Sequence, residues 1–243
     1  MRIIADYHTH TTFSHGSGSI EDNVKVAIEK GLKILAISDH GPGHAFYGIK
    51  KHRYKDMRTE IDRLNKKYPE IQILLSLEAN FMSVDGTLDV DEDLLALSDL
   101  IMCGYHFGST PKNLVLDVKM HVYAYLSRHS KSIYKKSEKI NTKMMINAMR
   151  KYNLTAITHP GAKGPIDIKQ VAQVASEKNV ALEVNVKHGH LTVDEIHEAM
   201  KTDVMFILGS DAHDPERVGD FAASLERCIE AGVPAERIMN AEV

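Results

Sequence analysis

The feature that most constrains the fold of this chain is the regular alternation of short apolar runs with helical stretches. Seven runs of β-branched and aliphatic residues are candidate strands: 2–7, 34–38, 71–77, 100–104, 154–158, 181–186 and 204–208. Nearly continuous apolar runs are typical of parallel strands that are covered on both faces. The alternation therefore predicts an α/β fold built on a parallel sheet.

Helix start and stop signals occupy the gaps between these runs. Ser19 can cap a helix that runs to about Lys30, and Gly31 can end it. Residues 192–195 read Thr-Val-Asp-Glu, a capping box that opens a helix to about Lys201. Further helices are predicted at 53–68, 91–98, 137–152, 167–178 and 216–231. Seven strand–helix units in one chain favour a closed or nearly closed barrel, with a doubly wound open sheet as the alternative.

Length and composition narrow the classes of function. The chain has 243 residues and no linker, low-complexity tract or internal repeat, so one domain spanning 1–243 is predicted. A net charge of −3 provides no global positive field for nucleic acid or an anionic membrane. Two cysteines, Cys103 and Cys228, cannot build a disulfide scaffold. No signal peptide or membrane-spanning run is visible, and we expect a cytoplasmic protein.

Histidines and carboxylates gather where the candidate strands end. The first strand continues into Asp6-Tyr-His8-Thr-His10, in which alternate residues face the same side. His15 follows in the next loop. Later strands end in Asp39-His40, Glu78-Ala-Asn80, Tyr105-His106, His159-Pro160 and Ser210-Asp211-Ala-His213. The carboxyl ends of parallel strands line one rim, which is where α/β proteins usually place the active site.

A single polar residue at a strand exit has an ordinary structural explanation. His40 or His106 alone would be a hydrogen-bonded surface residue more often than a ligand, and Glu78 alone could cap a helix. One metal cluster explains the whole set better than many coincidences on the same rim. Imidazole and carboxylate bind Zn²⁺, Mn²⁺ and iron. So many ligands exceed what one ion can use, which predicts two or three ions, with Glu78 or Asp211 bridging a pair.

Taken in order, the motifs D-x-H-x-H, S-D-H-G, E-A-N, G-x-H, H-P-G and G-S-D-A-H resemble those of the PHP (polymerase and histidinol phosphatase) superfamily. The resemblance is strongest to its YcdX-like phosphatases, which residues 77–86 and 234–240 also resemble. It implies a distorted, TIM-like (β/α)7 barrel with three divalent metal ions at the carboxyl-terminal rim of the strands. Zn is the expected metal, and Mn and Fe are the alternatives.

The resemblance also implies which residues hold the three ions. The three ligand groups are His8, His10 and Asp211; Glu78, His106 and His159; and His15, His40 and His213. Glu78 would also be shared with the first ion. Glu78 and Asp211 would be the catalytic pair, because they would bridge the ions and position a metal-bridging hydroxide.

Other residues near the motifs have less certain assignments from the sequence. Asp6 and Asp39 flank ligands and would each accept the second ring N–H of an imidazole. Arg217 either reaches the substrate phosphate or simply begins the last helix. Three more histidines follow strands and are candidates for substrate contact: His44, His188 and His190. The remaining histidines are expected at the surface: His52, His121, His129 and His197.

The interval between His106 and His159 departs from the YcdX-like pattern because it looks longer, and we place a basic insertion at about 111–150. Residues 128–151 carry eight Lys or Arg against one acid, Glu138, a local net charge of +7. The stretch is either a solvated helix face or a lid that presents cations to a phosphate. The spacing of the methionines at 144, 145 and 149 predicts buried core residues rather than a subunit contact. A homo-oligomer remains a possible assembly of this chain.

The predicted activity is metal-dependent hydrolysis of small phosphate monoesters, in which the ions activate water and neutralise the phosphoryl oxygens. Histidinol-phosphate phosphatase of histidine biosynthesis is the alternative. A nuclease is less expected, because the excess positive charge is confined to one insertion and the sequence shows no array of stacking aromatic residues. A non-catalytic metal-binding barrel is the remaining interpretation.

Overall fold

The structure is a computed structural model that describes residues 1–112 and 117–242, and its main feature is a seven-stranded parallel sheet. The strands follow the chain order: β2 (Ala5–Thr9), β3 (Ile34–Ile37), β4 (Gln72–Asn80), β5 (Leu100–Gly104), β6 (Ala156–Ile157), β7 (Ala181–Asn185) and β8 (Phe206–Gly209). Thr9, just at the end of β2, forms a parallel bridge with Ala212 beyond β8. This contact brings the two edges of the sheet together into a nearly closed barrel, which confirms the predicted TIM-like fold class.

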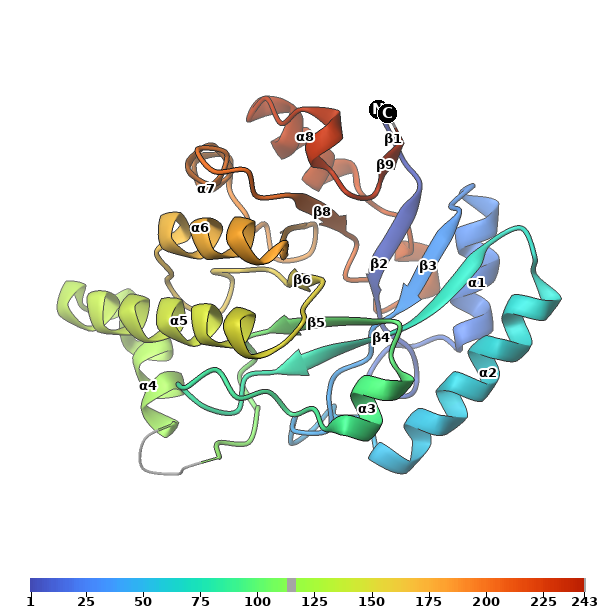
Figure 1. The fold of residues 1–243 in the computed structure, drawn as a ribbon, viewed down its shortest axis with the longest axis horizontal. Coiled ribbons are helices and arrows are strands. Elements are labelled where there is room, and N and C mark those ends of the chain that lie inside the picture. Colours follow the sequence, from blue (N-terminus) through green and yellow to red (C-terminus); the bar gives the residue numbers. More distant parts are fainter. Residues whose placement is uncertain (113–116, 243) are drawn as a thin grey trace.

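Helices cover the outside of the strands (Figure 1). They are α1 (Ile20–Glu29), α2 (Tyr54–Lys67), α3 (Glu92–Leu97), α4 (Val118–Leu126), α5 (Lys131–Lys151), α6 (Ile168–Lys178), α7 (Val193–Ala199) and α8 (Ala222–Glu230). Short 3₁₀ turns lie at η1 (Lys51–Arg53), η2 (Ser127–His129), η3 (Pro215–Arg217) and η4 (Ala235–Arg237). No helix among the described residues combines the length and apolar character needed to cross a membrane.

Both predicted capping boxes are present. Ser19 Oγ accepts the Asp22 backbone N–H, and the Asp22 carboxylate accepts the Ser19 N–H in return. Thr192 and Glu195 make the same reciprocal pair at the start of α7. Gly31 ends α1 with a φ of 73°, a conformation that a glycine adopts without steric cost. These ends of helices therefore follow from local sequence alone.

The first predicted strand, 2–7, is wrong because the chain there forms two strands. β1 (Arg2–Ile3) pairs antiparallel with β9 (Ala241–Glu242), and β2 begins only at Ala5. Ile4 lies between the two strands, and its backbone hydrogen bonds go to two different parts of the chain. Its N–H donates to the Asn240 carbonyl, while its own carbonyl accepts from Lys33 and Ile34 at the start of the barrel.

The helix predictions at 137–152 and 216–231 also need correction. Helix α5 begins six residues earlier than predicted, at Lys131, and α4 was not predicted. In α4 the apolar residues alternate with polar or larger ones with a period of two, a pattern typical of a strand. The second predicted helix divides into η3 and α8, because Gly219 takes a φ of 73° and donates its N–H to Asp6.

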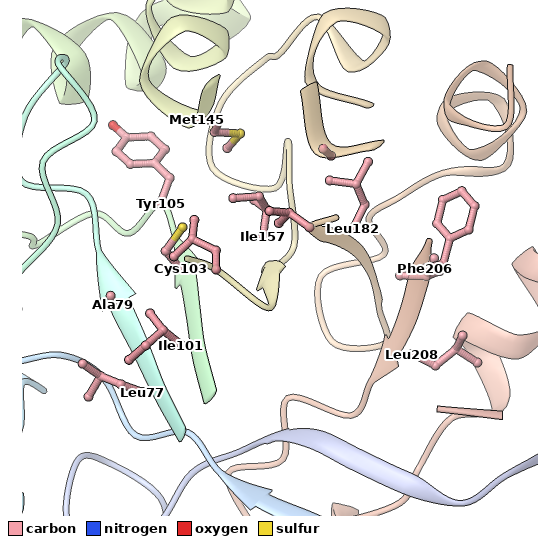
Figure 2. Close-up of a cluster of buried hydrophobic side chains, with 14 of the residues drawn as sticks. Leu77, Ala79, Ile101, Cys103, Tyr105, Met145, Ile157, Leu182, Phe206 and Leu208 are labelled. Carbon is pink, nitrogen blue, oxygen red and sulfur yellow. The ribbon is translucent and has the colours of Figure 1, made fainter. Parts of the chain in front are cut away.

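The main hydrophobic core lies between the strands and the helices that cover them, so the alternate residues of the strands face the inside of the barrel. Figure 2 shows Leu77, Ala79, Leu182 and Leu208 among the buried apolar side chains packed between strands and helices. Since neighbouring strand residues face opposite sides, the residues beside them, including Glu78, face inward. A small second cluster of buried apolar residues consists of Met102, Ala156, Ala181 and Ile207. The methionines at 144, 145 and 149 are buried, as predicted for core residues.

Candidate metal centre

The structure brings together all the side chains that the sequence analysis named as metal ligands. They lie at the carboxyl ends of the barrel strands and in the loops that follow them. Most are buried, and the two at the outer side of the group are half-buried. The buried members are His8, His10, His40, Glu78, His106, His159 and Asp211, and the half-buried ones are His15 and His213. The motifs are thus distant in sequence and close in space.

Glu78 lies at the middle of this group, fully buried on β4. Its Oε2 is 3.4 Å from His8 Nε2 and 3.6 Å from His10 Nε2. Its Oε1 is 3.2 Å from His106 Nε2 and 3.0 Å from His159 Nε2. His40 Nδ1 is also 2.9 Å from Oε2. The two oxygens of one carboxylate therefore face separate groups of imidazoles, which is the geometry of a bridging ligand.

The other imidazoles form a second part of the group, nearer to solvent. One ring nitrogen each of His10, His15, His40 and His213 lies within 4.8 Å of the others. His15 Nε2 and His213 Nε2 are 2.7 Å apart. Asp211 Oδ1 is 3.4 Å from His10 Nε2, which connects this part to the one around the buried carboxylate. Ligand positions for more than one ion therefore adjoin in the same cavity.

Several buried atoms of this group fit a divalent cation because they lack another partner. Among the described residues, His10 Nδ1 and His15 Nδ1 have no hydrogen bond, and His40 Nδ1 and Glu78 Oε2 lie 2.9 Å from each other with no further hydrogen bond. Leaving buried polar atoms unpaired is costly, and native proteins seldom do so. Imidazole nitrogens and carboxylate oxygens are ligands that Zn²⁺ accepts. The residues present therefore fit metal ions of the kind that the sequence predicted.

Glu183, on β7, is a residue that the sequence analysis missed. Its Oε1 is 2.7 Å from His8 Nδ1, and its Oε2 accepts the backbone N–H of His159 at 2.6 Å. If His8 donates from Nδ1, its Nε2 lone pair faces the group around Glu78. A signal was available: Glu183 and Asn185 are polar residues two apart in the otherwise apolar run 181–186.

Asn80, which ends β4, orients a second imidazole. Its Oδ1 is 2.8 Å from His106 Nδ1, so it can accept that N–H and leave His106 Nε2 free to bind a cation. The Asn80 amide is itself oriented, because its Nδ2 donates to Asp89 at 2.7 Å and to the Gly41 carbonyl at 3.2 Å. The sequence analysis quoted this asparagine in a motif without giving it a role.

Two glycines keep space open beside the carboxylates. A Cβ on Gly209 would overlap Glu183 Oε1, and a Cβ on Gly104 would overlap Thr158 Oγ1 and crowd Glu78. Thr158 donates to Glu78 Oε1 at 2.7 Å, so this crowding would disturb a functional contact. At both positions the strand therefore requires a residue without a side chain.

The surroundings lower the pKa of the Glu78 and Asp211 carboxyls and of several imidazoles of the group. Burial opposes ionisation of Glu78, but the adjacent His106, His8 and His40 outweigh it and hold the pKa of this carboxyl well below its usual range. Burial lowers the pKa of His10, His40 and His106. Neutral imidazole and ionised carboxylate are the protonation states that bind metal.

His8 is the exception among the buried imidazoles. Burial disfavours its charged form, yet the carboxylates of Glu183, Glu78 and Asp211 raise the pKa of His8 well above its ordinary value. The surroundings of His8 therefore favour positive charge. A proton or a metal ion can satisfy that preference.

The structure corrects the roles expected for two carboxylates beside the ligands. Asp6 accepts the backbone N–H groups of His8, Ser210 and Gly219 rather than a ring N–H. Asp39 accepts from the Thr11 backbone and hydroxyl and from Ser14, so it fixes the loop that carries His15. Asp6 therefore holds main chain, and Asp39 holds main chain and hydroxyls, rather than the rings of the ligands.

Arg217 does not belong to the cavity over the ligands. Its side chain is 59% exposed and pairs with Asp220 at 3.0 Å, because η3 ends at the turn formed by Gly219. The cavity, of about 260 Å³, is instead lined by two lysines, Lys163 and Lys187. Lys187 Nζ lies 2.9 Å from His213 Nδ1. The sequence analysis named neither lysine, since both lie in loops outside the motifs.

The histidines outside the motifs divide between cavity and surface. His44 and His188 line the same cavity, and His188 Nε2 is 3.5 Å from Asp211 Oδ2. His190 lines a neighbouring cavity instead. His121, which was expected at the surface, is half-buried and lies 3.0 Å from the Tyr105 hydroxyl.

Comparisons with known proteins agree with this geometry. A model of the PHP domain matches residues 6–207. A probable phosphatase of Shewanella frigidimarina is 30% identical over 99% of this chain and 90% of its own length. One from Shewanella loihica is 31% identical with the same shares. The crystal structure of a histidinol phosphate phosphatase from Lactococcus lactis, in complex with Zn, L-histidinol and phosphate, has a TM-score of 0.63 at 16% identity and covers 94% of this chain and 93% of its own. This chain belongs to the PHP domain family.

Proposed function

We propose that this protein is a metal-dependent phosphatase that hydrolyses small phosphate monoesters at a centre of three divalent ions, with Zn as the expected metal and Mn or Fe as alternatives. The observation that carries the proposal is the position of Glu78, whose two oxygens face separate groups of imidazoles. Relatives over nearly the whole chain are named probable phosphatases, which supports the reaction class.

The proposed ligand groups are those that the resemblance to PHP phosphatases implies, and short distances between their ligand atoms support them. They are His8, His10 and Asp211; Glu78, His106 and His159; and His15, His40 and His213, with Glu78 bridging to the first group. Bound divalent ions supply an activated water and neutralise the oxygens of a phosphoryl group. The role proposed for Glu78 and Asp211 is to fix the positions of the ions at which that chemistry takes place.

Two lysines give the cavity further positive charge for a phosphate dianion. Lys163 and Lys187 come from the loops after β6 and β7 and both line the cavity. Burial and the nearby Lys187 lower the pKa of Lys163. A phosphoryl group between the lysines would relieve their mutual repulsion, so we assign them to phosphate binding.

The form of the cavity supports a small substrate. The ligands lie at its base, and a volume of about 260 Å³ accommodates a phosphoryl group and part of a small alcohol rather than a polynucleotide strand. We propose that the whole chain acts as one domain, to which the basic insertion at about 111–150 belongs; residues 113–116 of that insertion lie outside the described residues. Location in the cytoplasm and assembly of the chain with itself stay predictions.

The test is metal analysis followed by hydrolysis assays on the purified protein. We expect about three equivalents of divalent metal, turnover of 4-nitrophenyl phosphate by the loaded protein, and loss of turnover after chelation that added metal reverses. A panel of monoesters that includes histidinol phosphate then ranks the substrates. Absence of turnover with Zn, Mn and Fe alike would reject the phosphatase and leave a metal-binding barrel.

A further inference from the structure

A second cavity adjoins the one over the ligands. It has a volume of about 310 Å³ and shares two lining residues, Phe107 and Lys163, with the first. Its other walls come from the loop after β6, from η2, from the first turn of α5, and from His190 and Glu195. We call it the leaving-group cavity, because a monoester whose phosphate lies over the ligands can extend its alcohol part into it. This inference rests on the proposed function.

Unpaired cations line the leaving-group cavity. Arg128 comes from η2 and Lys163 from the loop after β6. Within residues 1–112 and 117–242, no carboxylate forms an ion pair with either side chain. The Arg128 guanidinium lies 5.5 Å from the centre of the Tyr125 ring, which supports its position without neutralising it. Two cations from distant parts of the chain thus face one cavity.

The start of α5 adds positive potential at the same place. This helix has 21 residues, and its first turn contains no acidic residue. Its N-cap residue, Ser130, makes no side-chain hydrogen bond to the first turn, so the helix lacks the cap that the starts of α1 and α7 have. Tyr134, from this first part of the helix, lines the cavity. The helix dipole therefore acts together with Arg128.

Glu195, the one acidic side chain among the described residues that line the cavity, already has partners. Glu195 Oε2 accepts from the backbone and hydroxyl of Thr192, at 2.8 and 2.9 Å, and lies 3.3 Å from His190 Nδ1. Burial opposes its ionisation, but the hydrogen bonds from His190 and Thr192 lower the pKa of Glu195. The negative charge of Glu195 is therefore stabilised by its partners at the start of α7. The charge that remains without a partner in the cavity is positive.

We propose that the leaving-group cavity binds a second anionic group on the alcohol part of the substrate, with Arg128 as the residue that determines this specificity. The substrate class is then a phosphate monoester that carries a further carboxylate or phosphate. A charged guanidinium binds either anion with charge-assisted hydrogen bonds. The basic stretch 128–151 thereby gains a functional residue at its first position, while its other Lys and Arg side chains are exposed on α5.

The test compares two substrates of nearly the same shape, one with a carboxylate and one with a neutral amide at the same ring position. These are 4-carboxyphenyl phosphate and 4-carbamoylphenyl phosphate, with hydroquinone bisphosphate to show whether a second phosphate is preferred to a carboxylate. We expect kcat/KM of the metal-loaded enzyme to be about tenfold higher for the carboxylate than for the amide, the effect of one charge-assisted hydrogen bond. Arg128→Gln should remove this preference by lowering kcat/KM for the carboxylate toward the value for the amide. Arg150→Gln is the matched control, because Arg150 lies on α5 and lines a different groove.

A binding measurement separates this inference from the proposed function. Calorimetric titration with 4-carboxybenzylphosphonate and its carbamoyl analogue should show the same tenfold preference, lost in Arg128→Gln. Preferred binding of the carboxylate without hydrolysis of any ester would support the cavity and reject the phosphatase. Equal hydrolysis of carboxylate and amide would overturn the inference and leave the phosphatase. A preference for 4-(aminomethyl)phenyl phosphate would also overturn it, since Glu195 would then select the substrate.

Discussion

Glu183 connects two parts of the candidate metal centre through one buried carboxylate. One oxygen contacts the ring of His8 and the other holds the main chain at His159. We expect Glu183→Gln to lower metal affinity by about 10- to 100-fold, the range usual for partners of ligating histidines. Competition with a chromophoric chelator measures this affinity. Glu177→Gln on α6 is the control, and equal affinities in the two variants would show that Glu183 does not orient a ligand.

Substitution of Glu78 tests whether two of the proposed ions share this residue as a ligand. If its carboxylate bridges, Glu78→Ala should lose two ions together, because both lose a ligand at once. Metal content per protein, determined by mass spectrometry of the purified variant, gives the answer. Loss of a single ion would exclude a bridge. Asp93→Ala, which removes an exposed carboxylate from α3, should keep the full complement.

Asp89 makes the stability of the protein depend on pH. Burial, opposed by hydrogen bonds from Asn80 and Gly43, raises the pKa of Asp89 from 3.8 to about 6. The stabilisation by the protonated form is complete below the unfolded value and is lost as the pH rises through about 6. We expect the free energy of unfolding, relative to Asp89→Asn, to fall by up to about 3 kcal/mol between pH 4 and pH 7. Urea titrations across this range measure it, and a constant difference would refute the shift.

Residues of the site were predictable from sequence when they followed a strand in a recognisable motif. His8, Glu78 and Asp211 are of this kind, because a parallel barrel brings all strand exits to one rim. Glu183 lies within a strand, and its side chain reaches the ligands only because Gly209 on the next strand leaves room. Lys187 lies in a loop whose path no local pattern specifies. The room that one strand leaves for a side chain of the next, and the path of a loop, depend on the folded barrel. Local sequence patterns do not specify them, so the sequence analysis missed these two residues.

Among helices and strands too, features that depend on local sequence were predicted, and features that depend on distant contacts were not. The capping boxes at Ser19 and Thr192 were predicted, since they depend on residues three apart. Helix α4 was not, because its apolar residues alternate with the period of a strand while its neighbours α5 and η2 hold it as a helix. The division of the first strand at Ile4 depends on the C-terminal Asn240, which is distant in sequence.

The capping box of α1 provides a prediction at this scale. Ser19→Ala removes one oxygen that accepts the Asp22 N–H, and we expect the free energy of unfolding to fall by about 1 kcal/mol. Chemical denaturation measures this change. Metal content should stay the same, because Asp39 rather than Ser19 holds the loop that carries His15. A simultaneous loss of metal would show that the helix start supports the centre directly.

At the scale of the whole molecule, the proposed ligands span almost the entire chain, from His8 to His213. Ions bound by all of them stabilise only the folded barrel, because the unfolded chain cannot bring these residues together. We expect chelation to lower the free energy of unfolding by about 3 kcal/mol or more at metal concentrations a hundred times the dissociation constant. Thermal unfolding with and without chelator measures this, and an unchanged midpoint would argue against folding-linked ions.

The antiparallel pairing of Arg2 with Glu242 has a practical consequence. Arg2 precedes β2 and Glu242 pairs with it, so both lie toward the amino end of that strand, whereas the candidate centre lies beyond its carboxyl end. Figure 1 shows the N and C marks side by side. A surface anchor or a fluorescent tag attached at either end would leave the route of substrate entry unobstructed. A short peptide could also join these ends, so that a circular permutant opened in a helix-connecting loop keeps its barrel.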